Sequence, residues 1–519
     1  MKRVSTSRPD VVVGIDIGTT STKAIAYTAA GEALAQHAVE YPLLRPEPEA
    51  AEQDPEAIVA AVRACIAEVA RRCAPARVAG VSFSAAMHSV IAVDADGAPL
   101  TRSITWADNR AAAWAERIRD EWNGLAIHRR TGTPIHPMSP LAKLVWLRHE
   151  QPDLFARAAR FVGIKELVFH RLFGQWIVDH SIASATGLLA LESLDWDAEA
   201  LALAGVTAGR LSALVPTRHV VRGLSPADAK ALGLAADTPF VVGANDGVLS
   251  NLGLAAIHPG EVALTIGTSG ALRAVVDRPI TDARGRSFCY ALTERRWVVG
   301  GPVNNGGEVL RWLREGLAKA ECDAAAAAGG DAYAALDAIA AGVPAGAGGL
   351  LFHPFLAGER APWWDASLRG SFFGLAPQHR TAHLVRAAYE GVILNLHGIL
   401  GIVESLAGPT RSVRATGGFA RSATWRQIVA DVFGREVTIP RDHESSCLGA
   451  AVLGLWALGR ADSLEVVASM VGTTTRHEPV AAHVATYARL GEIFQSLPPR
   501  LHEQYRAIAA FQRGIHPEE

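Results

Sequence analysis

The sequence predicts an α/β protein built from two related halves. The chain has 519 residues, more than a single hydrophobic core usually organises, so two domains are expected. In its later part, short β-prone runs alternate with apolar helical segments, which is typical of a sheet covered by helices. A polar turn, IGTT at residues 17–20, also recurs as IGTS at residues 266–269. The same turn at two distant places indicates that the two halves share one construction.

The composition describes a soluble globular protein. Hydrophobic residues make up 49% and charged residues 20% of the chain, and the formal net charge is −2, which gives no indication of a nucleic-acid or membrane partner. Five cysteines are scattered without CxxC spacing, as expected for buried thiols in a reducing compartment. The N-terminal MKRVSTSRPD has no apolar segment behind its basic residues. We therefore expect a cytoplasmic protein without a signal peptide, with a disordered tail at residues 1–10.

Residues 11–28 are predicted to form a β-hairpin with an unusual turn. Apolar, β-branched residues run into and out of it, and Gly, Thr, Ser and Lys lie between, the pattern of two strands joined by a polar loop. Gly18 allows a close backbone approach, and the hydroxyls, amides and Lys23 are donors suited to an anion. Asp16, just inside the first strand, is placed to face that anion through a metal ion. This stretch alone is therefore either a Mg-nucleotide site or an ordinary hairpin with a polar turn.

The elements that follow in the first half are predicted from periodicity and end signals. Asp54 and Pro55 form an N-cap and a first helical residue, and the apolar residues after them recur at helical spacing. Residues 151–215 carry only weak signals of mixed helix and loop. We expect a strand at 33–41, a helix at 56–72, strands at 77–83, 90–93 and 240–244, a helix ending near residue 122 and another after residue 140.

The second half opens on the second hairpin and continues as an alternation of helices and strands. The boundary is expected within residues 250–259, which gives domains at 11–254 and 255–519. Beyond it we expect strands at 261–266 and 270–276, a helix and a loop within 323–349, a long buried helix that starts near residue 384 and stops at Gly408-Pro409, strands at 413–416 and 436–439, helices at 425–432 and 446–458, and a terminal helix within 478–511.

Three glycine-containing turns follow or join these strands, at residues 18–20, 267–269 and 417–418. None fits GxxxxGK(S/T), which disfavours a P-loop NTPase, and none fits GxGxxG in a strand–helix unit, which disfavours a dinucleotide fold. Polar residues also lie just past strand ends, where α/β proteins usually build their sites. His88 and Asp246 are two of them.

The order of these turns resembles that of a known superfamily. GIDIGTTSTK, LTIGTSG and ATGGFARS are similar to the phosphate-1, phosphate-2 and adenosine motifs of the actin–hexokinase–Hsp70 superfamily. Within it, MSPLAKLVWLRHE (138–150) and GSFFGLAPQHRTAHLVRAAYE (370–390) resemble the two signatures of the FGGY carbohydrate kinases, except that His149 replaces a usual acidic, amide or basic residue. GERAPWWD (358–365) is also typical, and the resemblance spans residues 11–460. It implies two RNase H-like (actin-like ATPase) domains with an interdomain cleft that closes on both substrates.

This resemblance implies an ATP-dependent kinase of a sugar hydroxyl that uses Mg²⁺. The segments SAAMHSV, WADNR and NDGVLSNLG are most similar to bacterial gluconokinases, which implies conversion of D-gluconate to 6-phospho-D-gluconate. One alternative is a xylulokinase-like kinase of a ketopentose or polyol, because xylulose kinases share the Met-His pair and the Trp-x-Asp-x-Arg pattern. The other is a non-catalytic nucleotide switch similar to actin or Hsp70, which would lack a sugar pocket.

The resemblance also implies roles for individual residues, since phosphoryl transfer needs a base, charge neutralisation and in-line positioning. Asp246, which ends a strand immediately before a Gly, would be the general base; the alternative is that it caps the following helix. Asp16 and Asp246 would hold Mg²⁺, largely through water. The residues assigned to the nucleotide are Gly18, Thr19, Thr20, Ser21, Lys23, Gly267, Thr268, Gly307, Arg311, Gly417, Gly418 and Ser422, with Arg311 at a place where relatives often have an amide.

The sugar pocket is assigned to residues at strand ends and within the motifs. They are Met87, His88, Trp106, Asp108, Arg110, Lys143 and Asn245, beside Asp246. A gluconate carboxylate needs a cationic or donor-rich partner, for which the candidates are His88, Arg110, Lys143 and Arg360. A single His or Trp is by default a packed core residue, but positions at strand ends inside motifs favour a site for His88 and Trp106. The expected partner is a small sugar acid or sugar, and a homodimer stays open.

Overall fold

The computed structural model describes residues 10–440, 444–472 and 474–515. The expected tail at residues 1–10 lies outside this part of the chain except for Asp10. That residue opens the first strand, and its carboxylate pairs with Arg77 at 2.8 Å and with Arg460 at 2.7 Å. Asp10 is therefore part of the fold and not of a tail.

The chain divides into two compact units. The first comprises residues 10–257, 276–298 and 444–472, and the second comprises 258–275, 299–440 and 474–515. The first passage of the chain between the units, at residues 257–258, is close to the boundary that the sequence predicts. Two later segments, 276–298 and 444–472, return to the first unit, so the units are not simple halves of the chain.

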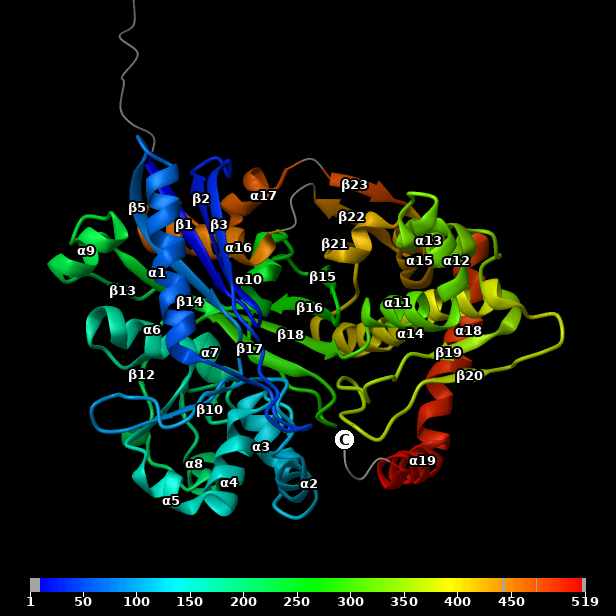
Figure 1. The fold of residues 1–519 in the computed structure, drawn as a ribbon, viewed down its shortest axis with the longest axis horizontal. Helices are drawn as coiled ribbons and strands as arrows, with labels where there is room; N and C mark the ends of the chain where they lie inside the picture. The colour runs from blue at the N-terminus through cyan, green and yellow to red at the C-terminus, as the bar shows by residue number, and fades with distance from the viewer. Residues whose placement is uncertain (1–9, 441–443, 473, 516–519) are drawn as a thin grey trace, which may run out of the picture. The chain divides into compact units, whose positions relative to one another are not determined.

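The first unit is organised around a six-stranded sheet of order β13-β14-β5-β1-β2-β3 (Figure 1). β1 and β2 form the predicted antiparallel hairpin, whereas β1 runs parallel to β5 and β5 runs parallel to β14. The carboxyl ends of β1, β5 and β14 therefore meet at one edge of this sheet. The strands are β1 Asp10–Ile17, β2 Ser21–Thr28, β3 Ala33–Glu40, β5 Arg77–Ala85, β13 Val220–Val221 and β14 Phe240–Asn245.

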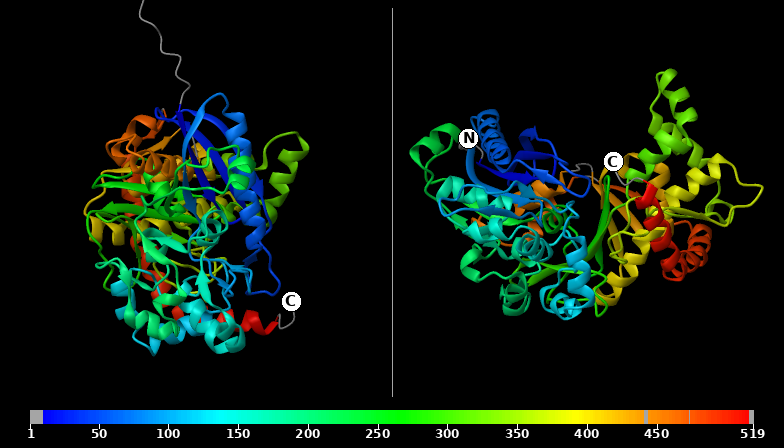
Figure 2. Two further views of the ribbon diagram at one scale, coloured as in Figure 1. Left: turned by 90° about the vertical axis from the view of Figure 1, so that its left-hand side faces the viewer. Right: turned by 60° about the horizontal axis from the view of Figure 1, so that its bottom comes forward.

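Two helices pack on this sheet. α1 (Pro55–Arg72) lies along β2 and β3, as Figures 1 and 2 show, and α16 (Ser445–Ala457) packs against β1 and β5. The predicted start of α1 is confirmed, because the Asp54 side chain accepts from the first free amides of the helix. α16 comes very close to β1, since a Cβ on Gly14 would lie 2.1 Å from the Cys447 carbonyl oxygen. Only glycine fits at that position of β1.

The region of weak sequence signals folds into short elements of the first unit. They include α5 Pro152–Arg157, β8 Arg160–Val162, α6 Ile164–Phe173, β9 Ile177–Asp179, α7 His180–Ser184, β10 Leu189–Ala190, β11 Asp195–Trp196, α8 Ala198–Ala204 and β12 Ala213–Val215. Before them lie β6 Ile91–Val93, α2 Ala112–Asp120, α3 Gly124–Thr131 and α4 Pro140–Glu150, and after them α9 Pro226–Leu232 and α10 Asp246–Gly253. Several of these short elements hold site residues in place.

A second sheet has the order β17-β18-β16-β15-β21-β22-β23. β15 pairs antiparallel with β16 and parallel with β21, β21 runs parallel to β22, and β22 pairs antiparallel with β23. Six strands of the second sheet thus repeat the order of the first sheet: β18-β16-β15-β21-β22-β23 corresponds to β3-β2-β1-β5-β14-β13. This correspondence confirms that the two halves share one construction. The strands are β15 Glu261–Ile266, β16 Gly270–Val276, β17 Phe288–Thr293, β18 Arg296–Val303, β21 Ser412–Thr416, β22 Glu436–Pro440 and β23 Thr474–His477.

Helices of the second unit depart from the sequence expectations mainly in length. α14 (Thr381–Ala407) begins three residues before the predicted start and ends, as predicted, at Gly408. It is long and apolar enough to cross a membrane by composition, and most of its apolar window is buried inside the protein. The predicted terminal helix is two helices, α18 (Ala481–Arg500) and α19 (His502–Ile515). The expected helix and loop after residue 322 contain the end of α12 (Lys319–Ala327) and all of α13 (Ala332–Ala341). α11 (Glu308–Trp312) and α15 (Ala423–Phe433) begin at two of the candidate nucleotide segments.

Candidate active site

Two carboxylates lie at the carboxyl edge of the first sheet. Asp16 is near the end of β1 and accepts a hydrogen bond of 2.7 Å from the Ser84 hydroxyl of β5, and Asp246 is the first residue after β14. Burial and the nearby Asp246 carboxylate raise the pKa of Asp16 to about 7, against the effect of the Ser84 hydrogen bond. Two coupled carboxylates are a hard, all-oxygen donor set that suits Mg²⁺ completed by water and phosphate. Within the described residues, no group of three His, Cys, Asp or Glu forms a fuller metal cage.

The helix after β14 is capped by Asn245 and not by Asp246. The Asn245 side-chain oxygen accepts from the Val248 amide at 2.8 Å, which is the N-cap bond of α10. The Asp246 carboxylate accepts from the adjacent Gly247 amide at 2.7 Å and stays partly exposed. The alternative role of Asp246 as a helix cap is therefore filled by its neighbour.

Asn245 itself is fully engaged inside the protein. It is 0% exposed, and its side-chain nitrogen donates to the Ser181 hydroxyl at 2.9 Å. Since its oxygen already caps α10, the amide has no exposed atom for a sugar. This geometry makes Asn245 a support behind Asp246, and its contact with the substrate stays a prediction.

The turn between β1 and β2 is held by side chains from other segments. The Gly18 amide donates to the Ser21 carbonyl at 2.9 Å, and this hydrogen bond closes the turn. The Trp106 indole N–H donates to the Thr19 hydroxyl at 2.9 Å, and the Tyr41 hydroxyl donates to the Gly18 carbonyl at 2.8 Å. Thr20 is exposed and Ser21 half-buried. Trp106, assigned to the sugar pocket, is thus bonded directly to a residue assigned to the phosphates.

Lys23, on β2, pairs with Glu444 at 2.5 Å. Both side chains are about a third or more exposed, at 32% and 42%, so the pair is an exchangeable surface contact. An incoming phosphate can therefore compete with Glu444 for the Lys23 ammonium. The structure does not bring Lys23 into a preformed anion cradle.

The turn between β15 and β16 is held by backbone instead. The Thr268 carbonyl accepts from the Gly306 amide at 3.0 Å and from the Glu308 amide at 3.1 Å, and the Gly307 amide donates to the Gly267 carbonyl at 2.6 Å. A Cβ on Gly306 would lie 2.6 Å from the Ser269 carbonyl oxygen. Gly307 is therefore part of the support of this turn, with Thr268 exposed on it.

A buried carboxylate fixes the segment that carries these glycines. Glu359, of the GERAPWWD segment, accepts from the Asn304 amide, from the Asn305 side chain at 3.1 Å and from the Asn395 side chain at 2.9 Å. Burial raises the pKa of Glu359 to about 7, against the effect of these hydrogen bonds. Arg360 beside it is 9% exposed and donates to the Val303 carbonyl at 3.0 Å. Arg360 thus helps to hold the end of β18.

The glycine turn after β21 meets the second hairpin of the same unit. Gly417 has a φ of +109°, and a Cβ there would lie 2.3 Å from the Ile266 carbonyl oxygen, whereas Gly418 faces open space. Ser422 caps α15 by accepting from the Trp425 amide at 2.9 Å and donates to Asp337 at 2.8 Å. The Ser422 hydroxyl is therefore engaged within the protein, and a nucleotide contact for Ser422 stays a prediction.

Arg311 lies one turn into α11, where it pairs with Glu308 on the same helix. Its side chain is 54% exposed, so the pair is worth little and leaves the guanidinium accessible. Arg311 remains near Gly307 in the chain, and its part in nucleotide binding stays a prediction.

Asp108 and Arg110 bind each other. Asp108 is 0% exposed and lies 2.7 Å from the Arg110 guanidinium, which also pairs with Glu52 at 2.6 Å and stacks over Trp146 at 4.7 Å. Asp108 further accepts from the Ala51 amide at 2.9 Å. With three carboxylates within 3.4 Å of it, the Arg110 charge is already compensated. The pair anchors a loop, which argues against Arg110 as the partner of a substrate carboxylate.

Lys143 is a structural lysine. It is 0% exposed, and its ammonium donates to the carbonyls of His88 at 2.7 Å, Thr105 at 2.7 Å and Met138 at 2.9 Å. An ammonium has three N–H groups, and these three short bonds occupy them. Lys143 thus ties together three segments of the chain, and its contact with a sugar stays a prediction.

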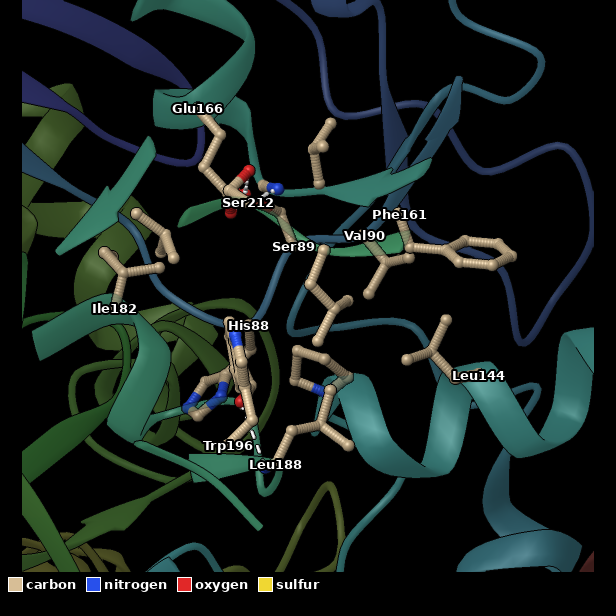
Figure 3. Close-up of a pocket in the computed structure, with 16 residues that line it drawn as sticks. His88, Ser89, Val90, Leu144, Phe161, Glu166, Ile182, Leu188, Trp196 and Ser212 are labelled. Atoms are coloured by element: carbon tan, nitrogen blue, oxygen red, sulfur yellow. Dashed lines mark hydrogen bonds between the residues drawn. The ribbon is translucent and has the colours of Figure 1, made fainter. Parts of the chain in front are cut away.

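His88 is held in one orientation. Its φ is +70°, it is 7% exposed, and its Nδ1 lies 2.7 Å from the Ala185 carbonyl, so Nδ1 carries the proton and donates. It lines a small cavity of about 30 Å³ together with Glu166 and Ser212 (Figure 3). That volume holds only a water or two, so it is not a sugar pocket. Met87, next to His88, is partly exposed.

Two family models match this chain. The N-terminal domain of the FGGY family of carbohydrate kinases matches residues 11–253, and the C-terminal domain of that family matches residues 262–458. The chain belongs to the FGGY family.

Curated relatives and solved structures agree with this assignment. Gluconokinases of Bacillus subtilis (strain 168) and Bacillus licheniformis are each 50% identical to this FGGY kinase over 505 residues, which are 97% of this chain and 98% of each relative. A xylulose kinase of Bacillus subtilis (strain 168) is 27% identical over 97% of this chain and 99% of its own length. A gluconate kinase structure from Lactobacillus acidophilus has a TM-score of 0.91 and 34% identity, covering 96% of this chain and 100% of that one. These neighbours share the two-domain, actin-like ATPase fold.

Sequence reasoning missed the residues behind the acidic edge of this FGGY kinase. Lys165, Asp179 and Ser181 are 3%, 0% and 0% exposed and hold the end of β14, yet they lie in the region of weak signals. The only available signal was a pair of charged residues among apolar neighbours, Lys165 after Ile164 and Asp179 after Val178. Such residues are seldom fully buried unless they are paired.

Proposed function

We propose that this FGGY kinase transfers the γ-phosphoryl group of ATP to D-gluconate and releases 6-phospho-D-gluconate and ADP. The choice of gluconate as substrate rests on a difference in sequence identity. The chain is 50% identical to the Bacillus subtilis gluconokinase and 27% identical to the xylulose kinase of the same organism, each over 97% of the chain. The position of Asp246 at the acidic edge supports the reaction.

In the proposed reaction, Asp246 is the general base. Its carboxylate takes the proton of the attacking gluconate hydroxyl as the new oxygen–phosphorus bond forms and the bond from the γ-phosphorus to ADP breaks. Asp246 suits this role because Asn245 relieves it of capping α10, so that its carboxylate stays partly exposed. Asp16 and Asp246 would hold Mg²⁺ through water, and the ion would neutralise charge on the phosphates.

The phosphate contacts are proposed for the two turns. Thr19, Thr20 and Ser21 would bind phosphate oxygens with hydroxyl and amide donors in the first unit, with Lys23 after release from Glu444. Gly267 and Thr268 would do so in the second unit, and Gly417 and Gly418 would lie against the adenosine. The closing cleft between the two domains stays a prediction of the sequence.

The substrate contacts are proposed for Met87, His88 and Trp106. Trp106 links the sugar segment to the phosphate turn through its hydrogen bond to Thr19. A change in this bond would therefore affect the binding of both sugar and ATP. For the carboxylate, the engagement of Arg110 and Lys143 leaves His88 and Arg360 as the proposed partners. The cytoplasm, which contains ATP, stays the expected location, and the five free, buried cysteines suit a reducing compartment.

A substrate panel tests the proposal. ADP release is measured with gluconate, xylulose, ribulose, glycerol and erythritol at matched concentrations. We expect gluconate to give the highest kcat/KM, by about tenfold or more, because a site built to bind a carboxylate rejects neutral analogues that leave its polar groups unpaired. A preference for xylulose would establish the ketopentose kinase, and ATP turnover that no sugar stimulates would establish the nucleotide switch. Either result would overturn the proposed substrate.

A further inference from the structure

A buried ion pair lies beneath the end of β14 and is unused by the proposed reaction. It joins Lys165, near the start of α6, to Asp179, the last residue of β9, with Nζ and Oδ2 2.7 Å apart. The two side chains are only 3% and 0% exposed. Removing two charges from water is costly, and a buried pair often contributes no net stability relative to apolar residues. A specific role in holding neighbouring groups explains its presence better than stability does.

The lysine of this pair bonds to the strand that delivers the proposed base. Its ammonium donates to the Ala244 carbonyl at 3.2 Å, two residues before Asp246. Ala244 lies in β14, which runs parallel to β5 at the carboxyl edge of the first sheet. Lys165 therefore holds the carbonyl of Ala244 near the end of β14.

The aspartate of the pair fixes a short helix. Its second oxygen, Oδ1, accepts from the Ile182 amide at 3.0 Å and so caps α7. The Ser181 hydroxyl of α7 then accepts from both nitrogens of Asn245, the backbone amide at 3.2 Å and the side-chain amide at 2.9 Å. Asn245 in turn caps the helix that Asp246 begins. Each step from Asp179 to Asp246 is a hydrogen bond or a peptide bond.

The same short helix also orients His88. The residue that follows α7, Ala185, accepts the Nδ1 proton of His88 through its carbonyl at 2.7 Å. His88 and Ile182 of α7 line the same small cavity (Figure 3). A shift of α7 would therefore move the support of the proposed base and the support of a proposed sugar residue together.

We propose that Lys165 and Asp179 are positioning residues: through α7 and the end of β14, they hold Asp246 and His88 in one mutual geometry. The inference rests on the roles proposed for Asp246 and His88. A misplacement of about 1 Å costs about 100-fold in rate when a base and a substrate must be aligned. The pair would therefore act on kcat and on gluconate, and not on the binding of ATP.

Two variants test the proposal at different points of the chain of bonds. In Lys165→Met with Asp179→Asn, both charges go together, so no uncompensated charge stays buried, and Asn keeps an oxygen for the Ile182 amide. In Ser181→Ala, only the hydroxyl between α7 and Asn245 is lost, which carries little risk of unfolding. We expect kcat with gluconate to fall about 30-fold or more in the first and about tenfold in the second, with KM for ATP within about twofold of the wild type.

Glu166→Gln is the matched control. Glu166 is the next residue of the same helix and is also buried, but it accepts from the Gly163 amide and the Ser212 hydroxyl instead. We expect this variant to change the midpoint of thermal unfolding and to keep kcat. An equal loss of kcat in the control would show general softening of the unit, and would overturn the proposal.

The outcome is separable from that of the proposed reaction. If Asp246→Asn is inactive while Ser181→Ala and the double variant keep wild-type kcat, the positioning role is refuted and the reaction stands. If Asp246→Asn keeps its turnover, the base assignment is refuted and the positioning role falls with it. If the double variant does not fold, Ser181→Ala alone decides: a selective loss of kcat supports the proposal, and an unchanged kcat overturns it.

Discussion

The two hairpins of this kinase occupy the same place in two sheets of the same strand order, yet their edges differ chemically. In the first, Asp16 lies opposite Ser84 of the parallel neighbour β5, and Asp246 follows the next strand. In the second, the equivalent of Asp16 is Thr265, which lies opposite Thr416 of β21. Within the described residues, the duplicated fold therefore supplies two such turns, and the acidic edge of the first sheet is the one suited to a metal ion and a base.

The two turns also differ in how they are held. Side chains of Trp106, Tyr41 and Gln53 bond to the first turn, at Gly18 and Thr19. The second turn is held by backbone amides of the segment that begins α11. The first turn is therefore sensitive to changes of side-chain chemistry elsewhere, whereas the second is sensitive to added bulk at its supporting glycines.

The largest expected effect is on the acidic edge. Asp246→Asn should lower kcat by about 1,000-fold, because the amide cannot accept the hydroxyl proton in the transition state. A change in the second sheet at the position equivalent to Asp16, Thr265→Val, should keep kcat, since no proton transfer is assigned to Thr265. ADP release at saturating gluconate and ATP measures both, and the midpoint of thermal unfolding shows that each variant is folded. Similar losses in the two variants would remove the asymmetry between the edges.

The second effect is on the support of the backbone-held turn. Gly306→Ala places a methyl group 2.6 Å from the Ser269 carbonyl oxygen, and such overpacking against backbone costs about 2 kcal/mol of unfolding free energy. We also expect a higher KM for ATP, because the turn that carries Thr268 must shift. Unfolding in urea and initial rates over a range of ATP concentrations measure the two effects.

Gly316→Ala is the control for this substitution, because a Cβ at Gly316 meets no atom within 4 Å. Its stability should stay within about 0.5 kcal/mol of the wild type, as for other exposed positions. If Gly306→Ala is as stable as Gly316→Ala and keeps its KM for ATP, the second turn does not depend on close packing.

The sequence predicted the parts of this molecule that depend on local pattern. The two hairpins, α1 with its Asp54 cap and the alternation after residue 380 follow from periodicity, glycine turns and end signals, which neighbouring residues determine. The repeat of IGTT as IGTS indicated two related halves, and the two sheets share one strand order. The stop of α14 at Gly408 also followed from its glycine–proline pair. The division of the terminal helix at Leu501 was less accessible, because packing decides where a marginal turn continues.

Side-chain contacts were less accessible from the sequence, because a motif shows which residue is present but not where its atoms point. Lys143 lies in a family signature, yet its ammonium faces three carbonyls. Asn245 precedes the proposed base, yet it caps α10 and bonds to Ser181. The Lys165–Asp179 pair joins residues from two elements with no shared pattern. Each of these roles depends on tertiary contacts that local spacing cannot encode.

The smallest expected effect concerns the side-chain bond of the first turn. Thr19→Val removes the acceptor of the Trp106 indole N–H, a hydrogen bond of 2.9 Å, which should cost about 1 kcal/mol of stability. Because Trp106 belongs to the proposed sugar pocket, KM for gluconate should rise together with KM for ATP. Thr268→Val is the counterpart: the described bonds of Thr268 to α11 use its carbonyl, so stability and KM for gluconate should stay unchanged and only KM for ATP should rise. Urea unfolding and the two KM values compare the pair. If both variants alter KM for gluconate equally, the Trp106–Thr19 bond does not couple the sugar segment to the phosphate turn, and the two turns are equivalent in spite of their different supports.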